Sequence, residues 1–263
     1  MKIASWNVNS IKVRAPHVLA WLQDNPVNVL GLQELKLPTE NFPYDDFEQA
    51  GYKAWANGQK TYNGVALIVK QNGSSMTDPA DIVDALPNFK DEQRRVIALT
   101  VGDLRIINLY VPNGQEVGSE KFEYKLSWLK ALREWLAAEK DKHANIAVMG
   151  DFNIAPKDDD VHDPEAWRGR ILFSEPEHQA LAELQSLDFN DSFRLFDQAE
   201  KTYSWWDYRL NAFKRKMGMR IDLILTNQAL SDKCTAAGID SEPRGWERPS
   251  DHAPVWAQFD FES

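Results

Sequence analysis

The sequence predicts an α/β protein in which two mixed β-sheets pack against each other and carry helices on their outer faces. Short apolar segments with strand-like patterning alternate with amphipathic helical segments along the chain. Hydrophobic residues make up 43% of the 263 residues, which is enough to bury a sizeable core. Because these signals run from Ile3 to Phe259 without a linker, we expect one domain that covers residues 1–263.

The N-terminal part of the chain is predicted to form a strand, a helix and a second strand. Residues 2–8 alternate in polarity like a strand, and residues 15–23 have helical spacing that ends at Asn25 and Pro26. Further apolar strands are expected at residues 27–33 and 65–69. Residues 95–101 and 104–111 flank a Gly-Asp turn, which predicts a hairpin with Tyr110 at its far end.

The second half of the chain repeats this alternation. Residues 120–140 place apolar side chains at helical spacing, which predicts a long amphipathic helix, and a shorter helix is expected near residues 177–187. A buried strand at residues 145–149 runs directly into a GDFN segment. The remaining strands are expected near residues 203–208, 221–226 and 254–259. Open sheets place their chemistry at strand ends, so the polar residues there are the first candidates for a functional site.

The composition argues against several classes of protein. The net charge of -10 is unsuited to a protein that coats nucleic acid non-specifically, although short basic tracts occur at residues 167–170 and 214–216. The single cysteine, Cys234, cannot form an internal disulfide, which favours the cytoplasm, and we expect its thiol to be buried and inert. With no apolar run long enough to cross a membrane and no signal peptide, the sequence predicts no membrane association.

Carboxylates, amides, one phenol and one imidazole stand at the predicted strand ends. Mg²⁺ prefers oxygen ligands and keeps several waters, so one or two carboxylates with an amide can hold it, and Glu34 is the best candidate. Phosphodiester hydrolysis also needs a group that orients a water and donors for the charge that develops on phosphate. The strand-end residues of suitable type are Asn7, Glu34, Tyr110, Asp151, Asn153, Asp222, Asp251 and His252.

Seven motifs in series resemble the exonuclease III family of abasic-site endonucleases and 3'-end-trimming enzymes. They are WNVNS at 6–10, LQELK at 32–36, GQKTYNGVA at 58–66, GDFNI at 150–154, WDYR at 206–209, RID at 220–222 and SDHAP at 250–254. The resemblance implies a four-layered α/β sandwich like that of deoxyribonuclease I. It also implies a monomeric hydrolase of duplex DNA that uses Mg²⁺, or Mn²⁺ as a substitute. Such an enzyme cuts 5' to abasic sites, removes blocking groups from 3' ends and degrades duplexes in the 3'-to-5' direction.

The resemblance implies a catalytic group of five residues. Asp151 would activate or orient the attacking water, while Asn153 and Tyr110 would hold the scissile phosphate. Tyr110 suits either a phosphate ligand or a proton donor. His252 would contact a phosphate oxygen, and Asp222 would orient it. This agrees with the chemistry of the residues, because a carboxylate beside an imidazole fixes its tautomer and favours its charged form next to a phosphate.

The resemblance further implies a metal site and a substrate pocket. Glu34 would bind the metal, with Asn7 and Asp251 close by. A small apolar pocket would accept a sugar that has lost its base and would exclude a normal nucleotide by size. The matching positions are Trp205, Met219 and Ile221, which would be ordinary core residues in most folds.

Contacts with DNA are expected from the matching motifs and from the basic tracts. These residues are Lys60, Tyr62, Asn63, Trp167, Arg168, Arg209, Lys214, Arg215, Lys216 and Arg220. The rim segment at residues 163–174 is short and bulky, so we expect it to obstruct a strand that continues past the lesion and to bias the enzyme toward 3'-end lesions. In the alternative interpretation, Trp167 folds back as a hydrophobic plug and Arg168 is solvated.

Two other functions are possible on these residues. Phosphatases and phosphodiesterases that act on inositol lipids and sphingomyelin share the Glu, Asp-x-Asn and Asp-His parts of the site. They lack the GQKTYNG and WxDYR segments in this form. A DNA-binding relative without catalytic activity would have lost site residues, yet every expected position is filled. The sequence leaves open the physiological metal and the balance among endonuclease, 3'-trimming and exonuclease activities.

Overall fold

The computed structural model describes residues 1–71 and 79–260, and within them twelve strands form two six-stranded mixed sheets. The first sheet has the strand order β11 (Cys234–Ile239), β12 (Val255–Phe259), β1 (Lys2–Asn7), β2 (Val29–Gln33), β4 (Val65–Lys70) and β3 (Tyr52–Asn57). The second has the order β5 (Ala80–Val83), β6 (Val96–Val101), β7 (Leu104–Tyr110), β8 (Asn145–Asp151), β10 (Asp222–Asn227) and β9 (Phe189–Asp191).

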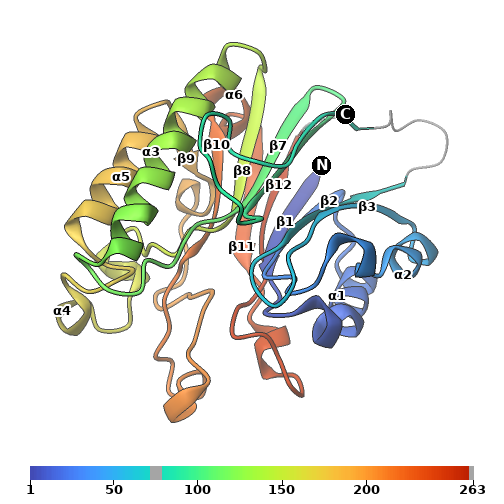
Figure 1. Ribbon diagram of the computed structural model, residues 1–263. Coiled ribbons are helices and arrows are strands. Elements are labelled where there is room, and N and C mark those ends of the chain that lie inside the picture. The colour runs from blue at the N-terminus through green and yellow to red at the C-terminus, as the bar shows by residue number, and fades with distance from the viewer. Residues whose placement is uncertain (72–78, 261–263) are drawn as a thin grey trace.

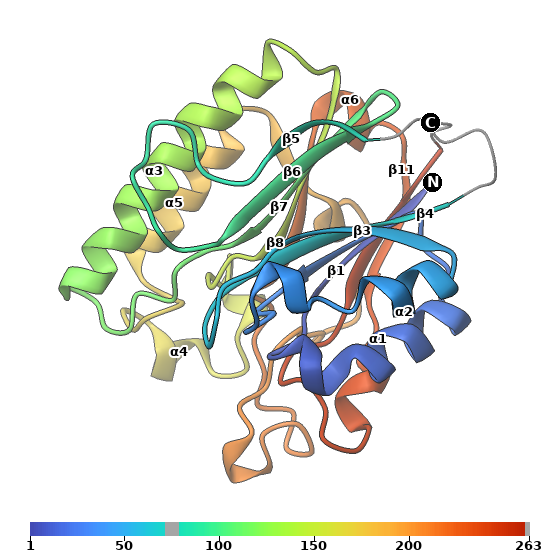
Figure 2. The same cartoon turned by 45° about the vertical axis from the view of Figure 1, so that its right-hand side comes forward.

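Helices cover the outer face of each sheet, which gives four layers (Figures 1 and 2). The first sheet carries α1 (Ile11–Asp24) and α2 (Tyr44–Gln49), and the second carries α3 (Glu120–Lys140) and α5 (Glu175–Gln185). Shorter helical segments are α4 (Pro164–Trp167), α6 (Gln228–Ser231), η1 (Thr39–Asn41), η3 (Asp158–Asp160), η4 (Ser192–Leu195), η5 (Arg209–Asn211) and η6 (Glu242–Gly245). The predicted four-layered α/β sandwich is confirmed. Within the described part of the chain, no helix is long and apolar enough to span a membrane.

Alternating side chains of each strand serve two different layers of the core. On β2, Val29 packs between the sheets, whereas its neighbour Leu30 packs under α1 and α2. On β8, Ala147 packs between the sheets, whereas Val148 packs under α3 and α5. Both faces of the central strands are therefore buried, which explains their almost continuous apolar sequences.

A buried amide links the two sheets across the central layer. Asn108 on β7 donates hydrogen bonds to the carbonyl oxygens of Leu32 and Ala66 in the other sheet, at 3.0 and 2.8 Å. Its own oxygen accepts a bond of 2.6 Å from Gln33. A Cβ at Gly31 would lie only 2.7 Å from Asn108 Oδ1, so the glycine provides the space for this approach. These contacts fix the position of one sheet relative to the other.

The parallel strand pairs bring polar strand ends to one edge of the sandwich. β1 runs parallel to β2 with Asn7 opposite Gln33, and β7 runs parallel to β8 with Tyr110 opposite Asp151. The antiparallel strand β10 begins at the same edge, where Asp222 lies opposite Asp151. Loops from the last third of the chain project beyond this edge, below the sheets in Figure 1.

The structure differs from the sequence-based expectations in several elements. Helix α1 begins at Ile11, four residues before the predicted start, and residues 203–208 form no strand. In that segment Trp205 makes only isolated bridges, to Met219 and to His252, because its backbone is paired with other loops instead of a continuous strand. Strands β3, β5, β9 and β11 were not predicted, and all four lie at sheet edges.

Candidate active site

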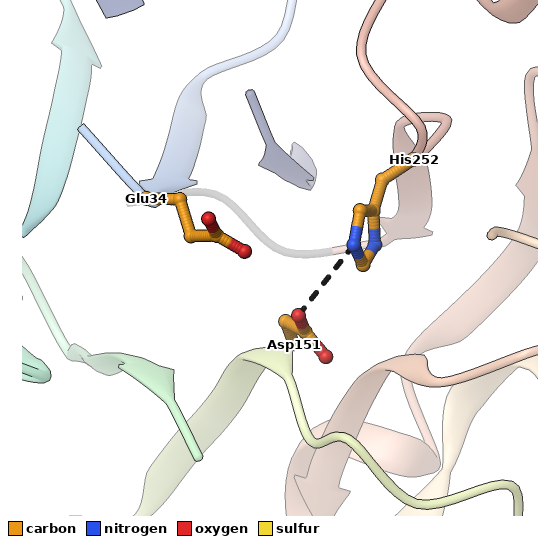
Figure 3. Close-up of side chains that lie close together, drawn as sticks. All are labelled: Glu34, Asp151 and His252. Atoms are coloured by element: carbon orange, nitrogen blue, oxygen red, sulfur yellow. Dashed lines mark ion pairs between the residues drawn. The ribbon is translucent and has the colours of Figure 1, made fainter. Parts of the chain in front are cut away.

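Two carboxylates and one imidazole converge where the two sheets end (Figure 3). Glu34 directly follows β2, Asp151 ends β8, and His252 precedes β12. One ligand atom from each lies within 4.8 Å of the others. His252 and Glu34 approach Asp151 from opposite sides, and the His252 Nε2 atom lies 3.7 Å from Asp151 Oδ2. Residues from both sheets therefore form one charged group.

Asn7 holds the two carboxylates of this group together. Its amide nitrogen lies 2.9 Å from Glu34 Oε1 and 2.9 Å from Asp151 Oδ2. Glu34 itself has a φ of +52°, a backbone conformation that residues other than glycine seldom adopt. The next two residues donate their backbone N–H groups to the carbonyls of Gly64 and Asn63, which stabilises this bend. The side chain of Glu34 is thereby directed from its strand end toward Asp151.

His252 is held in one orientation and in its charged form. Its Nδ1 atom lies 2.8 Å from Asp222 Oδ2, and the same carboxylate oxygen accepts a bond of 2.7 Å from the Ser204 hydroxyl. Burial alone would lower the pKa of His252, but the Asp222 and Asp151 carboxylates outweigh it and raise the pKa to about 10. An imidazolium at neutral pH can donate from Nε2 to an anionic oxygen.

Asp151, by contrast, is shifted toward its neutral form. Complete burial raises its pKa, with help from the negative charges of Asp222 and Glu34, whereas His252 and the Asn7 amide lower it, and the result is a pKa of about 7. A carboxyl that titrates near neutral pH can accept a proton from water and release it again. Among the residues predicted to be catalytic, Asp151 is therefore the one suited to act as a base.

Tyr110 and Asn153 also lie close to Asp151. Burial and the nearby Glu34 and Asp151 carboxylates keep the pKa of Tyr110 well above its usual value, so its phenol stays protonated and can donate. Asn153 donates its backbone N–H to Asp151 Oδ1 at 2.9 Å. Its side-chain oxygen accepts a bond of 3.0 Å from Asn113. Asn113 was not predicted, although it follows the strand that ends at Tyr110 and the strand-end argument could have found it.

The donors of this centre suit a hard divalent cation. Glu34 and Asp151 offer carboxylate oxygens, and two carboxylates with retained waters satisfy Mg²⁺ or Mn²⁺. The structure places the predicted ligand Asp251 differently. It is not part of the group of Glu34, Asp151 and His252, and its oxygens accept bonds from Asn9 at 2.9 Å and from the Trp205 indole at 3.1 Å. Within the described residues, the group of acids and imidazole that could hold an ion is Glu34, Asp151 and His252.

The three residues predicted to line a substrate pocket do come together. Met219, Ile221, Leu172 and Phe173 belong to one buried apolar cluster, against which the partly buried Trp205 packs. Trp205 also pairs through its backbone with His252, so the cluster adjoins the charged centre. The core interpretation holds for Met219 and Ile221, which are almost fully buried, while Trp205 remains accessible.

The predicted DNA contacts fall into exposed and buried groups. The side chains that are exposed are Lys60, Tyr62, Arg168, Arg209, Lys214, Arg215 and Lys216. Asn63 is buried, and its amide donates to Gln59 in its own loop and to Gln93 in a neighbouring segment. The prediction for Arg220 is wrong. It is 1% exposed, and its guanidinium is paired with Asp160 and Asp191, so it cannot reach a DNA phosphate.

The rim residues Trp167 and Arg168 adopt the alternative arrangement. Trp167 is partly buried and packs against the apolar cluster of Met219 and Phe173. Arg168 is exposed, and its guanidinium pairs with Asp158 at 3.1 Å and Glu165 at 2.9 Å. The tryptophan therefore adds bulk beside the pocket, while the charge of the arginine is shared with two surface acids.

Comparison with known proteins agrees with this fold. The Endonuclease/Exonuclease/phosphatase family matches residues 4–252. Exodeoxyribonuclease III of Haemophilus influenzae is 37% identical over 98% of this chain and 100% of its own length. A structure of a 3' phosphatase from Neisseria bound to product DNA hairpin has a TM-score of 0.95 at 44% identity, covering 99% of this chain and 100% of that one. An AP endonuclease from Archaeoglobus fulgidus has a TM-score of 0.93 at 35% identity, with coverage of 99% and 100%.

These similarities extend over nearly the whole chain, as do the seven motifs. The fold and site define a phosphoester hydrolase of the endonuclease, exonuclease and phosphatase superfamily. Within that superfamily, the chain belongs to the exonuclease III and AP endonuclease family of DNA repair nucleases.

Proposed function

We propose that this chain hydrolyses duplex DNA 5' to abasic sites and removes blocking groups from 3' ends, with 3'-to-5' exonuclease activity. The observation that supports this most directly is the position of the centre formed by Glu34, Asp151 and His252. It adjoins an apolar cluster with an accessible tryptophan, Trp205. A phosphate could react at the centre while a sugar without a base occupies the apolar side.

Each side chain of the centre has a role that its geometry supports. Glu34 and the Asp151 carboxylate, aligned by Asn7, would hold a divalent cation, Mg²⁺ or Mn²⁺, which supplies positive charge to the phosphate when bound. Asp151 orients a water and accepts its proton as the water attacks phosphorus. His252, kept cationic by Asp222, donates to a phosphate oxygen as negative charge develops.

Three neutral side chains near Asp151 would hold the phosphate in place. Asn153, Asn113 and the Tyr110 hydroxyl supply neutral donors, and the network among the two asparagines limits their movement. The bond to the 3' oxygen breaks, which leaves a 3'-hydroxyl on one fragment and the phosphate on the other. Tyr110 stays protonated because its pKa is well above neutral, so it is also suited to donate a proton to the departing oxygen.

A bias toward 3'-end lesions is part of the proposal. Although Trp167 is folded back against the apolar cluster, its ring still fills space beside the proposed pocket, and we expect a strand that continues past the lesion to meet it. A strand that ends at the lesion avoids this obstruction. The Neisseria relative described as a 3' phosphatase, which is 44% identical, adds support.

We also propose that one domain and one copy of the chain carry the whole activity. Glu34 comes from the first sheet and Asp151 from the second, so neither sheet contains the centre alone. All proposed site residues belong to this chain. Cys234 is only partly buried, so the expected full burial of its thiol is wrong, and as a free thiol it suits a cytoplasmic location.

The decisive experiment compares three duplexes: one with an internal tetrahydrofuran site, one nicked with a 3'-phosphate, and one undamaged. We expect cleavage of the first two that requires Mg²⁺ or Mn²⁺ and stops in EDTA. Binding of the duplexes without cleavage would identify a non-catalytic DNA-binding protein. Hydrolysis of inositol phosphates or sphingomyelin in place of DNA would identify a superfamily member of another class.

A further inference from the structure

A fully buried lysine and glutamate lie directly behind the proposed phosphate site. Lys125 on α3 and Glu177 on α5 form an ion pair, and both side chains are 0% exposed. Replacing a buried ion pair by apolar side chains is often neutral for stability, so stability alone does not account for such a pair. The contacts that each partner makes with the neighbouring loops are therefore the feature to explain.

The Lys125 ammonium is bonded to the two loops that carry the phosphate-holding asparagines. It donates to the carbonyl oxygen of Asn153 at 2.7 Å and to that of Asn113 at 3.2 Å. With Glu177 as third acceptor, all three of its N–H groups are used. A Cβ at Gly114 would lie 3.1 Å from Lys125 Cδ, so the stem of the lysine packs against the Asn113 loop as well.

The Glu177 carboxylate is bonded to the segment that walls the apolar pocket. Its Oε1 atom accepts from the backbone N–H of Leu172 at 3.1 Å. Its Oε2 atom accepts from the backbone N–H and the hydroxyl of Ser174, at 3.1 and 2.6 Å. The bonds to Ser174 form a capping box at the start of α5, but the bond to Leu172 and the burial of the carboxylate go beyond what capping requires.

We infer that Lys125 and Glu177 form a positioning pair that sets the distance between the phosphate-holding loops and the pocket wall. The Lys125 ammonium fixes the backbone of Asn113 and Asn153, and the Glu177 carboxylate fixes that of Leu172 and Ser174. Because the ammonium and the carboxylate are paired directly, a shift of the asparagine loops also shifts the pocket wall. This inference rests on the proposed function, because it concerns a substrate that occupies both parts of the site at once.

The distance between the asparagine loops and the pocket wall should matter more for an abasic site than for a 3'-phosphate. An internal abasic site must place its phosphate against the asparagines and its sugar against the apolar wall together. A terminal 3'-phosphate needs the asparagines but leaves the wall without a sugar. Loss of the pair should therefore slow cleavage at an abasic site more than removal of a 3'-phosphate.

The test uses Lys125→Met, Glu177→Gln and the double variant, with Arg105→Met as the matched control. Arg105 and Glu139 form a second buried ion pair, between β7 and the other end of α3, with side chains 2% and 3% exposed. Each substitution removes a buried cation from a buried carboxylate, so Lys125→Met and Arg105→Met should each lower the Tm. Glu139 keeps Lys142 at 3.1 Å, so we expect the smaller loss of Tm in Arg105→Met. The control thus tests the loss of a buried cation away from the site.

The measurements are Tm, and kcat and KM on the abasic and 3'-phosphate duplexes. We expect Lys125→Met to lower kcat on the abasic duplex by roughly 10- to 100-fold, with a smaller loss on the 3'-phosphate duplex. KM should change little, because affinity for DNA comes from dispersed phosphate contacts. Arg105→Met should keep the wild-type ratio of the two rates. The double variant should recover Tm toward that of the wild type without recovering kcat.

Three outcomes would overturn the inference. The first is a wild-type ratio of the two rates in Lys125→Met, and the second is a loss of kcat in Arg105→Met equal to that in Lys125→Met. The third is recovery of both Tm and kcat in the double variant. If Lys125→Met does not fold, the double variant supplies the same comparison with Glu177→Gln. A wild-type protein that cleaves neither duplex would instead contradict the proposed function, so the two failures are distinct.

Discussion

At the scale of single residues, Asp151 connects the parts of the centre. Its oxygens receive the Asn7 amide from the first sheet and the backbone N–H of Asn153 from its own loop, and His252 approaches from the C-terminal region. Glu34 reaches it from β2 through the same Asn7 amide. In the proposed mechanism Glu34 serves metal binding alone, whereas Asp151 also activates water, so substitution of each carboxylate should have a different effect.

Glu34→Ala should weaken metal activation, and Asp151→Asn should stop turnover while leaving DNA binding intact. Removing a ligand raises the metal concentration needed for half-maximal rate by roughly tenfold or more. Removing the base lowers kcat by roughly 10²- to 10⁴-fold. Metal titrations of the rate and Kd measurements on a tetrahydrofuran duplex check both. Asp232→Asn, at an exposed position, is the control, and near-normal cleavage by Asp151→Asn would show that the assigned base is wrong.

His252→Ala should lower the rate by on the order of 10² or more, because it removes a cationic donor to the phosphate. The wild-type rate should fall as the pH rises through about 10, where His252 loses its proton. Asp222→Asn should cost less and move this fall to lower pH, since the Asp222 carboxylate is the main group that raises the pKa of His252. The pH–rate profiles of the three proteins decide this; identical profiles for wild type and His252→Ala would exclude the imidazole.

The same pKa shift predicts how stability depends on pH in the metal-free protein. The pKa of His252 rises from 6.5 to about 10 on folding, so its contribution is fully present below pH 6.5 and is lost as the pH rises toward 10. Urea unfolding in EDTA across this range should therefore show declining stability. Asp222→Asn should reduce the decline, and an unchanged slope in that variant would contradict the assigned cause.

At the scale of elements, the rim around α4 lies beside the apolar cluster. Trp167 ends α4 and packs against the apolar cluster, and the next residue, Arg168, is held by Asp158 and Glu165. The rim is therefore ordered by contacts with its surroundings before any DNA binds. Its bulk lies beside the residues proposed to accept the sugar.

Removal of this bulk should raise activity on internal sites. We expect wild-type kcat/KM to be higher on a nicked duplex with a 3'-phosphate than on a duplex with one internal abasic site. Trp167→Ala should raise the internal rate by roughly tenfold relative to the end-directed rate, because it enlarges the space beside the pocket. Arg168→Gly should act in the same direction but less strongly, since Arg168 is exposed. Parity of the two substrates in the wild type, or preference for the internal site, contradicts the proposed bias.

At the scale of the whole molecule, the centre depends on how the two sheets sit against each other. Asn7 and Glu34 belong to one sheet and Tyr110 and Asp151 to the other. Buried contacts near the middle of the strands, around Gly31 and Asn108, fix this arrangement. The interface between the sheets is thus a determinant of the active site as well as of the core.

Gly31→Ala should destabilise the fold and lower activity together. The added methyl group would lie 2.7 Å from Asn108 Oδ1 and 2.9 Å from Met149 Cε, so the side chains that join the sheets must shift. Overpacking of this kind lowers the free energy of unfolding by about 1–3 kcal/mol. Gly245→Ala is the matched control, because a Cβ there would meet only Phe213, at 3.8 Å. Equal stability of the two variants in urea unfolding would contradict this account of the interface.

Much of this architecture was determined by the sequence itself. The period of the apolar residues located the central strands and α3, because strands buried on both faces and a long amphipathic helix have strong local patterns. The polar residues that follow those strands identified Glu34, Tyr110, Asp151 and Asp222. Parallel neighbours end at the same edge of a sheet, so candidates of this kind come together once the strands are known.

The burial and pairing of individual charges depended on contacts between residues far apart in the chain. Local sequence patterns carry no information about such contacts. Arg220 has the chemistry of a phosphate contact, yet Asp160 and Asp191 make it a buried ion pair. In the sequence Lys125 is one of several lysines in a predicted amphipathic helix, yet in the structure Glu177 and the two asparagine loops bury its charge. Burial and the choice of partner are decided by packing, because the free energy of a charge depends on what surrounds it after the chain has folded. The sequence thus determined which groups are present and where strands end, and only the tertiary structure decided which charges are buried in ion pairs and which converge at the centre.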